Sequence, residues 1–188
     1  MPDQERRHTI AVLVDNEPGV LARVIGLFSG RGYNIESLTV AEVDEANGLS
    51  RINIVTTGTP LVVEQIRSLL AKLVPVHRVL DLTLSGTHVE RELALVKVSG
   101  DRERLIEALR IADFMHARLV ASSPKSLVFE ATGGPDELDA FIELLRPIEV
   151  SRAGIVAIGR GDAVLSTDRL KSEQTNPKPM SVKKASER

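Results

Sequence analysis

The chain has 188 residues, enough for two small domains or one ordinary domain, and its 43% hydrophobic and 27% charged residues are typical of a packed globular protein. A formal net charge of −2 and an aromatic content of 3%, with no tryptophan, disfavour nucleic acid as a partner, because nucleic-acid binding needs basic surfaces and stacking side chains. The absence of cysteine excludes disulfides, thiolate catalysis and cysteine-ligated metals, and it suits a reducing cytoplasm.

The amino-acid sequence also shows no pattern typical of a membrane or export signal. Residues 1–7 carry charges but are not followed by the apolar run of a secretory signal. No stretch approaches the roughly 18 consecutive apolar residues of a membrane-spanning helix. We therefore expect a cytoplasmic protein with no membrane partner.

The first half of the chain predicts six elements in the order βαββαβ. β-Branched apolar runs and period-two alternation mark the strands, an Asn-Gly pair at 47–48 marks a hairpin, and an apolar period of three or four residues marks the helices. The predicted strands are 9–14, 34–43, 49–57 and 76–84; the apolar period of the first predicted helix starts at Val20, and Pro60 opens the second helix. This order closes as a four-stranded antiparallel sheet with both helices on one face. Apolar positions on the other face, such as Val55, predict that a second copy or a partner covers it.

The second half repeats this order without clear residue identity to the first. The predicted strands are 93–98, 118–122, 126–132 and 149–158; Asp101 caps a helix over 105–111 and Pro135 opens another. The fold class is therefore α+β, with two ferredoxin-like βαββαβ modules, each an antiparallel sheet with two helices on one face.

Domain boundaries follow from composition. Residues 85–91 are short and polar, which predicts a linker with a boundary near residue 86. The expected domains are residues 8–84 and residues 88–160. Beyond residue 161 the chain is rich in Lys, Ser and Pro with almost no apolar periodicity, so we expect residues 163–188 to form a disordered tail.

A possible anion pocket lies at the first strand-to-helix junction. Asn16 can cap the helix or line a pocket, Pro18 fits the first helical turn, and Gly19 allows a close approach. The free N–H groups and the positive dipole end of a helix attract a carboxylate or phosphate. The spacing alone favours a plain turn with a helix cap over a pocket.

Catalytic and metal-binding patterns are weak. The four histidines never take a helical metal spacing, and no phosphate-binding glycine loop is present. Ser122 and Lys125 match a Ser-x-x-Lys pattern, but Pro124 places them in a hairpin turn instead of at a helix start. No nucleophile, base and orienting group come together, which favours a binding or regulatory role over an enzyme.

Several stretches together resemble a known family. Asn-Glu-Pro-Gly-Val-Leu at 16–21, Arg-Val-Ile-Gly-Leu-Phe at 23–28, Arg-Gly-Tyr-Asn-Ile-Glu-Ser-Leu-Thr-Val at 31–40 and His-Val-Glu-Arg-Glu-Leu at 88–93 closely resemble the small regulatory subunit of acetolactate (acetohydroxyacid) synthase. The resemblance covers residues 8–160, and its first half is similar to an ACT domain, an amino-acid-sensing βαββαβ module. The segment after Pro147 is a few residues shorter than the family pattern, and the tail is longer.

This resemblance implies a function in branched-chain amino acid biosynthesis. Such a subunit has no catalytic site, forms a homodimer, binds and activates the catalytic large subunit, and confers feedback inhibition by valine. Thiamine diphosphate, Mg and FAD are then expected in the large subunit, with no cofactor in this chain. The implied effector lies between two ACT domains and contacts Asn16, Pro18, Gly19, Val20 and Leu21 of one chain and Asn34 and Ile35 of the other.

Two alternatives stay open at this point. The chain could be a free-standing amino-acid-sensing ACT regulator of another enzyme or of transcription, which a basic recognition helix would favour, although none is visible. The effector could also be leucine or isoleucine, because one methylene in an apolar pocket changes affinity by only ~1 to 3 kcal/mol.

Overall fold

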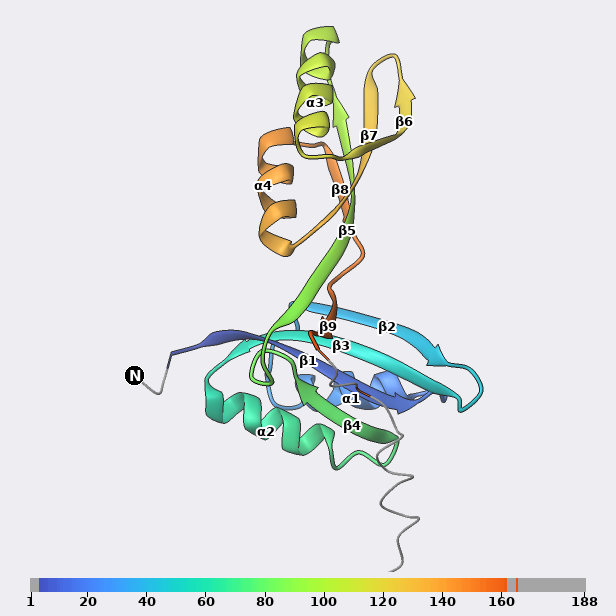
Figure 1. Cartoon of the computed structure of the whole chain (residues 1–188), viewed down its shortest axis with the longest axis vertical. Helices are drawn as coiled ribbons and strands as arrows, with labels where there is room; N and C mark the ends of the chain where they lie inside the picture. Colours follow the sequence, from blue (N-terminus) through green and yellow to red (C-terminus); the bar gives the residue numbers. More distant parts are fainter. Residues whose placement is uncertain (1–3, 162–164, 166–188) are drawn as a thin grey trace, which may run out of the picture.

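The computed structural model describes residues 4–161 and residue 165, which form two lobes joined by a long strand (Figure 1). The N-terminal lobe contains β1 (Arg6–Asp15), α1 (Val20–Ser29), β2 (Ser37–Asp44), β3 (Leu49–Gly58), α2 (Pro60–Leu70) and β4 (Val76–Asp81). Its sheet is antiparallel with the strand order β2-β3-β1-β4, so β2 and β4 are the edges. The α+β class and the βαββαβ order are confirmed. Strand β2 begins at Ser37, three residues later than predicted.

The core of this lobe lies between the sheet and its two helices. Alternate residues of β1, namely Ile10, Val12 and Val14, point to the helices and are at most 1% exposed. They pack against Phe28 of α1 and Ile66 of α2. Because side chains alternate across a strand, this register leaves Thr9, Ala11 and Leu13 on the other face of the sheet.

The C-terminal lobe repeats the architecture. It contains β5 (His88–Ser99), α3 (Arg102–Phe114), β6 (Arg118–Ser123), β7 (Ser126–Gly133), α4 (Pro135–Leu145) and β8 (Glu149–Arg152), and β9 (Val156–Gly159) follows. The strand order β6-β7-β5-β8 matches that of the first sheet. Phe129 and Phe141 fill the core between this sheet and α3 and α4.

The connection between the lobes differs from the predicted linker. His88 to Arg91 were expected in a polar linker, but they form the first part of β5 and pair with β9. The predicted closing strand 149–158 is broken into two, because Gly154 takes a φ of +87° and redirects the chain. The segment β8 pairs with the C-terminal lobe, whereas β9 returns to the N-terminal lobe.

The two-stranded ribbon of β9 and the start of β5 covers much of the outer face of the first sheet. Ala157 packs against Ala11 and Leu82, and Val55, which we expected to be partly exposed in a lone unit, is 0% exposed. The chain therefore supplies part of the cover that was predicted to come from a second copy. The predicted tail, residues 163–188, lies outside the described residues apart from Leu165, which is half-buried against the same apolar contact.

Candidate functional site

The turn before α1 exposes an uncapped helix start. Gly19 is the N-cap, with a φ of +86°, and no side chain makes a capping hydrogen bond there. By contrast, α2 is capped by Thr59 and α3 by Asp101. Because the first turn of a helix has no intrahelical partners for its N–H groups, the start of α1 offers donors to a ligand.

The surroundings of this turn are open. A Cβ atom built on Gly19 would meet nothing within 4 Å. Asn16 is exposed and its backbone N–H donates to the Gly48 carbonyl, 2.7 Å away. Val20 is only 4% exposed and anchors the helix in the core, whereas Leu21 is 37% exposed. The turn thus combines a fixed backbone with an accessible surface.

The second predicted segment leads into β2. The Asn34 carbonyl accepts a hydrogen bond from Thr56 Oγ1 at 2.6 Å, and the Glu36 N–H donates to the Val55 carbonyl at 2.8 Å. The Asn34 side chain is exposed, while Ile35 is half-buried against the core of its own lobe. Backbone contacts therefore hold this segment while the Asn34 amide is accessible.

The strand register places these two segments at opposite ends of the sheet. Ser37, at the start of β2, pairs with Val55, which pairs with Thr9. Thr9 lies six residues before the end of β1 at Asp15, which is about 20 Å along an antiparallel strand. One small ligand cannot contact both Asn16 and Asn34 of the same chain.

Comparison with known proteins decides the family. The family model for the AHAS small subunit-like ACT domain matches residues 10–78, and the model for the small subunit of acetolactate synthase matches residues 91–161. The chain is 46% identical over 159 residues to a probable acetolactate synthase small subunit of Archaeoglobus fulgidus, covering 83% of this chain and 98% of that protein. The chain belongs to the acetolactate synthase small-subunit family. It is therefore a regulatory subunit whose N-terminal lobe is an ACT domain.

Further relatives agree with this assignment. The Escherichia coli acetolactate synthase isozyme 3 small subunit is 43% identical over 163 residues, which cover 85% of this chain and 99% of that protein. The crystal structure of the Thermotoga maritima acetolactate synthase small subunit superimposes with a TM-score of 0.76 at 38% identity, covering 84% of this chain and 99% of that one. Allosteric regulation and branched-chain amino acid biosynthesis follow from the family.

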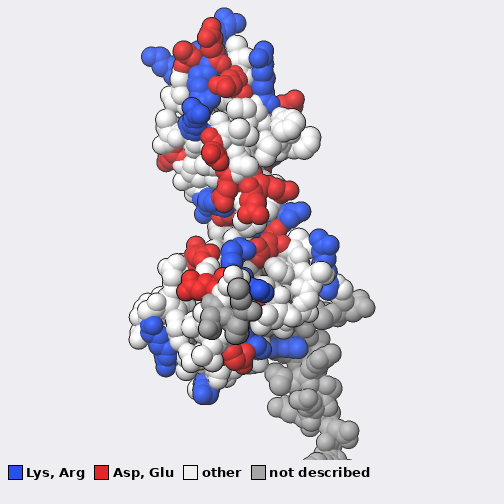
Figure 2. Space-filling view, turned by 90° about the vertical axis from the view of Figure 1, so that its left-hand side faces the viewer, with Lys and Arg blue, Asp and Glu red and all other residues white. Residues whose placement is uncertain are grey.

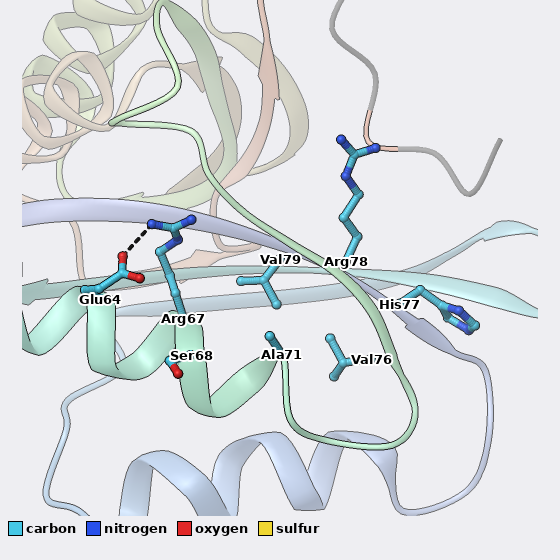
Figure 3. Close-up of a pocket in the computed structure, with 8 residues that line it drawn as sticks. All are labelled: Glu64, Arg67, Ser68, Ala71, Val76, His77, Arg78 and Val79. Carbon is cyan, nitrogen blue, oxygen red and sulfur yellow. Dashed lines mark hydrogen bonds and ion pairs between the residues drawn. The ribbon is translucent and has the colours of Figure 1, made fainter. Parts of the chain in front are cut away.

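A groove elsewhere on the ACT domain contains none of the residues predicted to bind the effector. A groove of about 360 Å³ lies between α2 and β4, where Arg67 pairs with Glu64 at 2.6 Å (Figure 3). None of the residues predicted to bind the effector lines it. Within residues 4–161, no group of three or more His, Asp or Glu side chains is placed to hold a metal ion. None of the described helices is long and apolar enough to cross a membrane.

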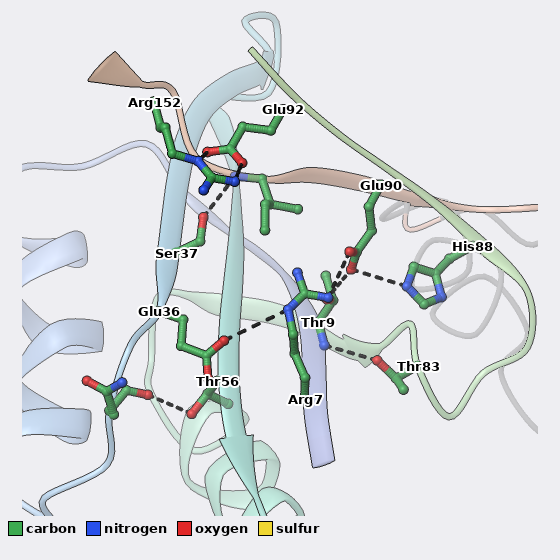
Figure 4. A network of polar contacts seen from close by, with 12 residues as sticks. Arg7, Thr9, Glu36, Ser37, Thr56, Thr83, His88, Glu90, Glu92 and Arg152 are labelled. Carbon is green, nitrogen blue, oxygen red and sulfur yellow. Dashed lines mark hydrogen bonds and ion pairs between the residues drawn. The ribbon is translucent and has the colours of Figure 1, made fainter. Parts of the chain in front are cut away.

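Residues that sequence reasoning missed lie at the junction of the two lobes. Charged side chains of both signs gather there (Figure 2). Arg7 of β1 lies between Glu36 and Glu90, with its Nη1 atom 2.9 Å from Glu90 Oε2, and Thr9 Oγ1 donates to the same carboxylate (Figure 4). Burial would raise the pKa of Glu90, but the hydrogen bonds from Thr9, Arg7 and His88 and the charge of Arg7 outweigh it and hold that pKa below its usual value.

A second cluster ties the C-terminal lobe to the same place. Arg152 of β8 makes a bidentate pair with Glu92, at 3.0 and 2.5 Å, and contacts Asp139 of α4 at 2.5 Å. The hydrogen bond with Glu92 is the main reason that the pKa of Arg152 is raised. The Glu92 carboxylate also accepts from the Gly154 N–H at 3.2 Å. The alternation of Glu90 and Glu92, which places both carboxylates on one face of a strand, was the available sequence signal.

Proposed function

We propose that this chain activates the catalytic large subunit of acetolactate synthase and makes it sensitive to feedback inhibition by valine. The observation that carries the proposal is the uncapped start of α1 behind Gly19, where backbone donors and the positive helix end fit the carboxylate of a free amino acid. The half-exposed Leu21 beside it suits an apolar side chain. Thiamine diphosphate, Mg and FAD belong in this proposal to the large subunit.

The proposed valine site is completed by a second copy of the chain. Strand β2 is an edge, so two copies can pair through it about a twofold axis. The register Glu42 to Ser50 to Val14 sets the end of β2 level with the end of β1. Antiparallel pairing of two β2 strands therefore brings Asn34 of one chain to the end of the sheet where Asn16 of the other lies. This arrangement supports a homodimer with two equivalent sites.

The test uses the purified chain with and without the large subunit. Alone, the chain should form no acetolactate; added to the large subunit, it should raise the rate and make that rate sensitive to valine. Formation of acetolactate by the isolated chain, or a valine-insensitive complex, would contradict the proposal.

Substitution of Gly19 tests the site itself. Gly19→Asp places a carboxylate beside the effector carboxylate, and a repulsion of at least ~1.4 kcal/mol corresponds to about tenfold weaker valine inhibition. Gly19→Asn is the matched control, because Asn has the same shape and also tolerates a positive φ but carries no charge. If both variants respond to valine equally, the effector carboxylate does not bind at this turn.

A further inference from the structure

Two side chains of β2 hold one residue of the segment that returns from the C-terminal lobe. Ser37 Oγ accepts a hydrogen bond from the Ile155 N–H at 2.8 Å, and Thr39 Oγ1 donates to the Ile155 carbonyl at 3.1 Å. We call Ser37, Thr39 and Ile155 the β2 clasp. Both polar groups of one residue are thus bound by alternate side chains on the outer face of an edge strand.

Side chains of the neighbouring strand β3 hold the β2 clasp in place. Asn53 Nδ2 donates to Thr39 Oγ1 at 3.0 Å, and Arg51 Nε donates to Asn53 Oδ1 at 3.1 Å. Arg51 Nη2 then donates to the Ala157 carbonyl at 2.6 Å. The backbone of residues 155–157 is therefore held by a ladder of directional hydrogen bonds, which weaken steeply with distance and angle. An apolar contact would allow residues 155–157 to slide over the sheet, whereas these hydrogen bonds hold them in one position.

On one side the clasp continues into the C-terminal lobe. Ile155 is 7% exposed and lies three residues after Arg152, which Glu92 and Asp139 bind. The Glu92 carboxylate also holds the N–H of Gly154. The short segment from Arg152 to Ile155 is fixed at both ends, so a displacement of Ile155 acts on β5 and α4.

On the other side the clasp continues into the segment proposed to bind the effector. Asn34 and Ile35 immediately precede Glu36 and Ser37, and backbone bonds to β3 hold this segment at Asn34 and Glu36. Glu36 also lies within 3.9 Å of Arg7, the partner of Glu90. A ligand that pulls on Asn34 therefore acts on Ser37 through three peptide units.

We propose that the β2 clasp transmits the effect of effector binding from the ACT domain to the C-terminal lobe. In this proposal Ser37 and Thr39 are positioning residues, because they act through the backbone of Ile155. This inference rests on the proposed valine site and names the route by which it regulates. Breaking the clasp separates valine binding from valine inhibition.

The experiment compares Ser37→Ala/Thr39→Val with the wild-type chain, both full length. Calorimetry measures valine binding to the regulatory subunit alone, and acetolactate formation over a valine series measures inhibition of the complex. The double variant should bind valine within about threefold of wild type while its maximal inhibition falls by at least half, because coupling and not affinity is lost. Thr39→Ser keeps the hydroxyl and should retain full inhibition. Thr132→Val, at an exposed position on β7, is the control for a Thr-to-Val change elsewhere.

Three outcomes overturn the inference. Full inhibition of the double-variant complex at saturating valine shows that the clasp transmits nothing. Loss of valine binding in the double variant places Ser37 or Thr39 in the site itself. Absence of valine binding and inhibition in the wild-type chain removes the proposed function, and the coupling with it; the wild-type titration alone distinguishes this case from the other two.

Discussion

Replacement of Gly154 by alanine tests how closely the returning segment packs on β2. Gly154 has a φ of +87°, and a side chain there costs about 1–2 kcal/mol because the left-handed region brings Cβ against the backbone. Its Cβ would also lie 2.8 Å from Thr39 Cγ2 and 3.1 Å from Ser37 Oγ. Overpacking of this kind adds about 1–3 kcal/mol. We expect Gly154→Ala to lower the free energy of unfolding by ~2–5 kcal/mol in total.

The matched control is Gly19→Ala. Gly19 has nearly the same φ, +86°, but its Cβ would meet nothing within 4 Å, so only the backbone cost of about 1–2 kcal/mol applies. The difference between the two variants isolates the contact with β2. Thr39→Ser removes the methyl group that clashes and keeps the hydroxyl, so it should recover about 1 kcal/mol or more in the Gly154→Ala background.

Urea unfolding, followed by far-ultraviolet circular dichroism, measures these differences. All variants are compared at one protein concentration, because the stability of the proposed dimer would depend on it. Equal losses for Gly154→Ala and Gly19→Ala, or no recovery with Thr39→Ser, would show that Gly154 does not pack against β2 as described.

Two further predictions concern stability. Asp101→Ala removes the side chain that caps α3 by accepting from the Arg104 N–H at 2.9 Å, and should cost ~1 kcal/mol in urea unfolding, whereas Asp101→Asn, which still caps, should cost much less. The pKa of Glu90 is depressed in the folded chain, so its contribution is present above the unfolded value of about 4.3 and is lost as the pH falls through the folded value. In the Glu90→Gln variant, the free energy of unfolding should therefore fall less steeply as the pH drops below about 5. Glu64→Gln, at an exposed ion pair, should leave that acid limb unchanged, and an equal effect of both would refute the role of Glu90.

Local patterns were sufficient to predict the order of elements from β1 to β8. Hydrophobic periodicity located the four helices of the described residues, and Asp101 was predicted as a cap because its spacing to the first apolar residue is local information. The first helix was also predicted, but its start was wrong: Pro18 lies in the turn before α1 and not in its first turn, and Gly19 is the N-cap instead of Asn16.

Long-range pairing was the part that the sequence did not reveal. Glu90 looks like part of a linker because it is charged, yet in the folded chain it pairs with the polar side chains of Arg7 and Thr9. Gly154 interrupts residues that otherwise alternate as one strand, and a glycine inside a strand marks such breaks only weakly. The predicted effector residues remain a prediction, because half of the proposed site would come from a second chain and no single-chain pattern reports it.

The two-stranded ribbon has a mechanical consequence. Strand β5 is 12 residues long, about 40 Å, and belongs to both lobes, while β9 returns beside its first part. The C-terminal lobe therefore lies between these two strands in the sequence, and a two-stranded ribbon joins it to the ACT domain instead of a single flexible linker. Because two hydrogen-bonded strands make this connection, we expect the C-terminal lobe to rotate as one body relative to the ACT domain. We expect that a glycine-rich insertion into only one of the two strands would make the connection between the lobes flexible.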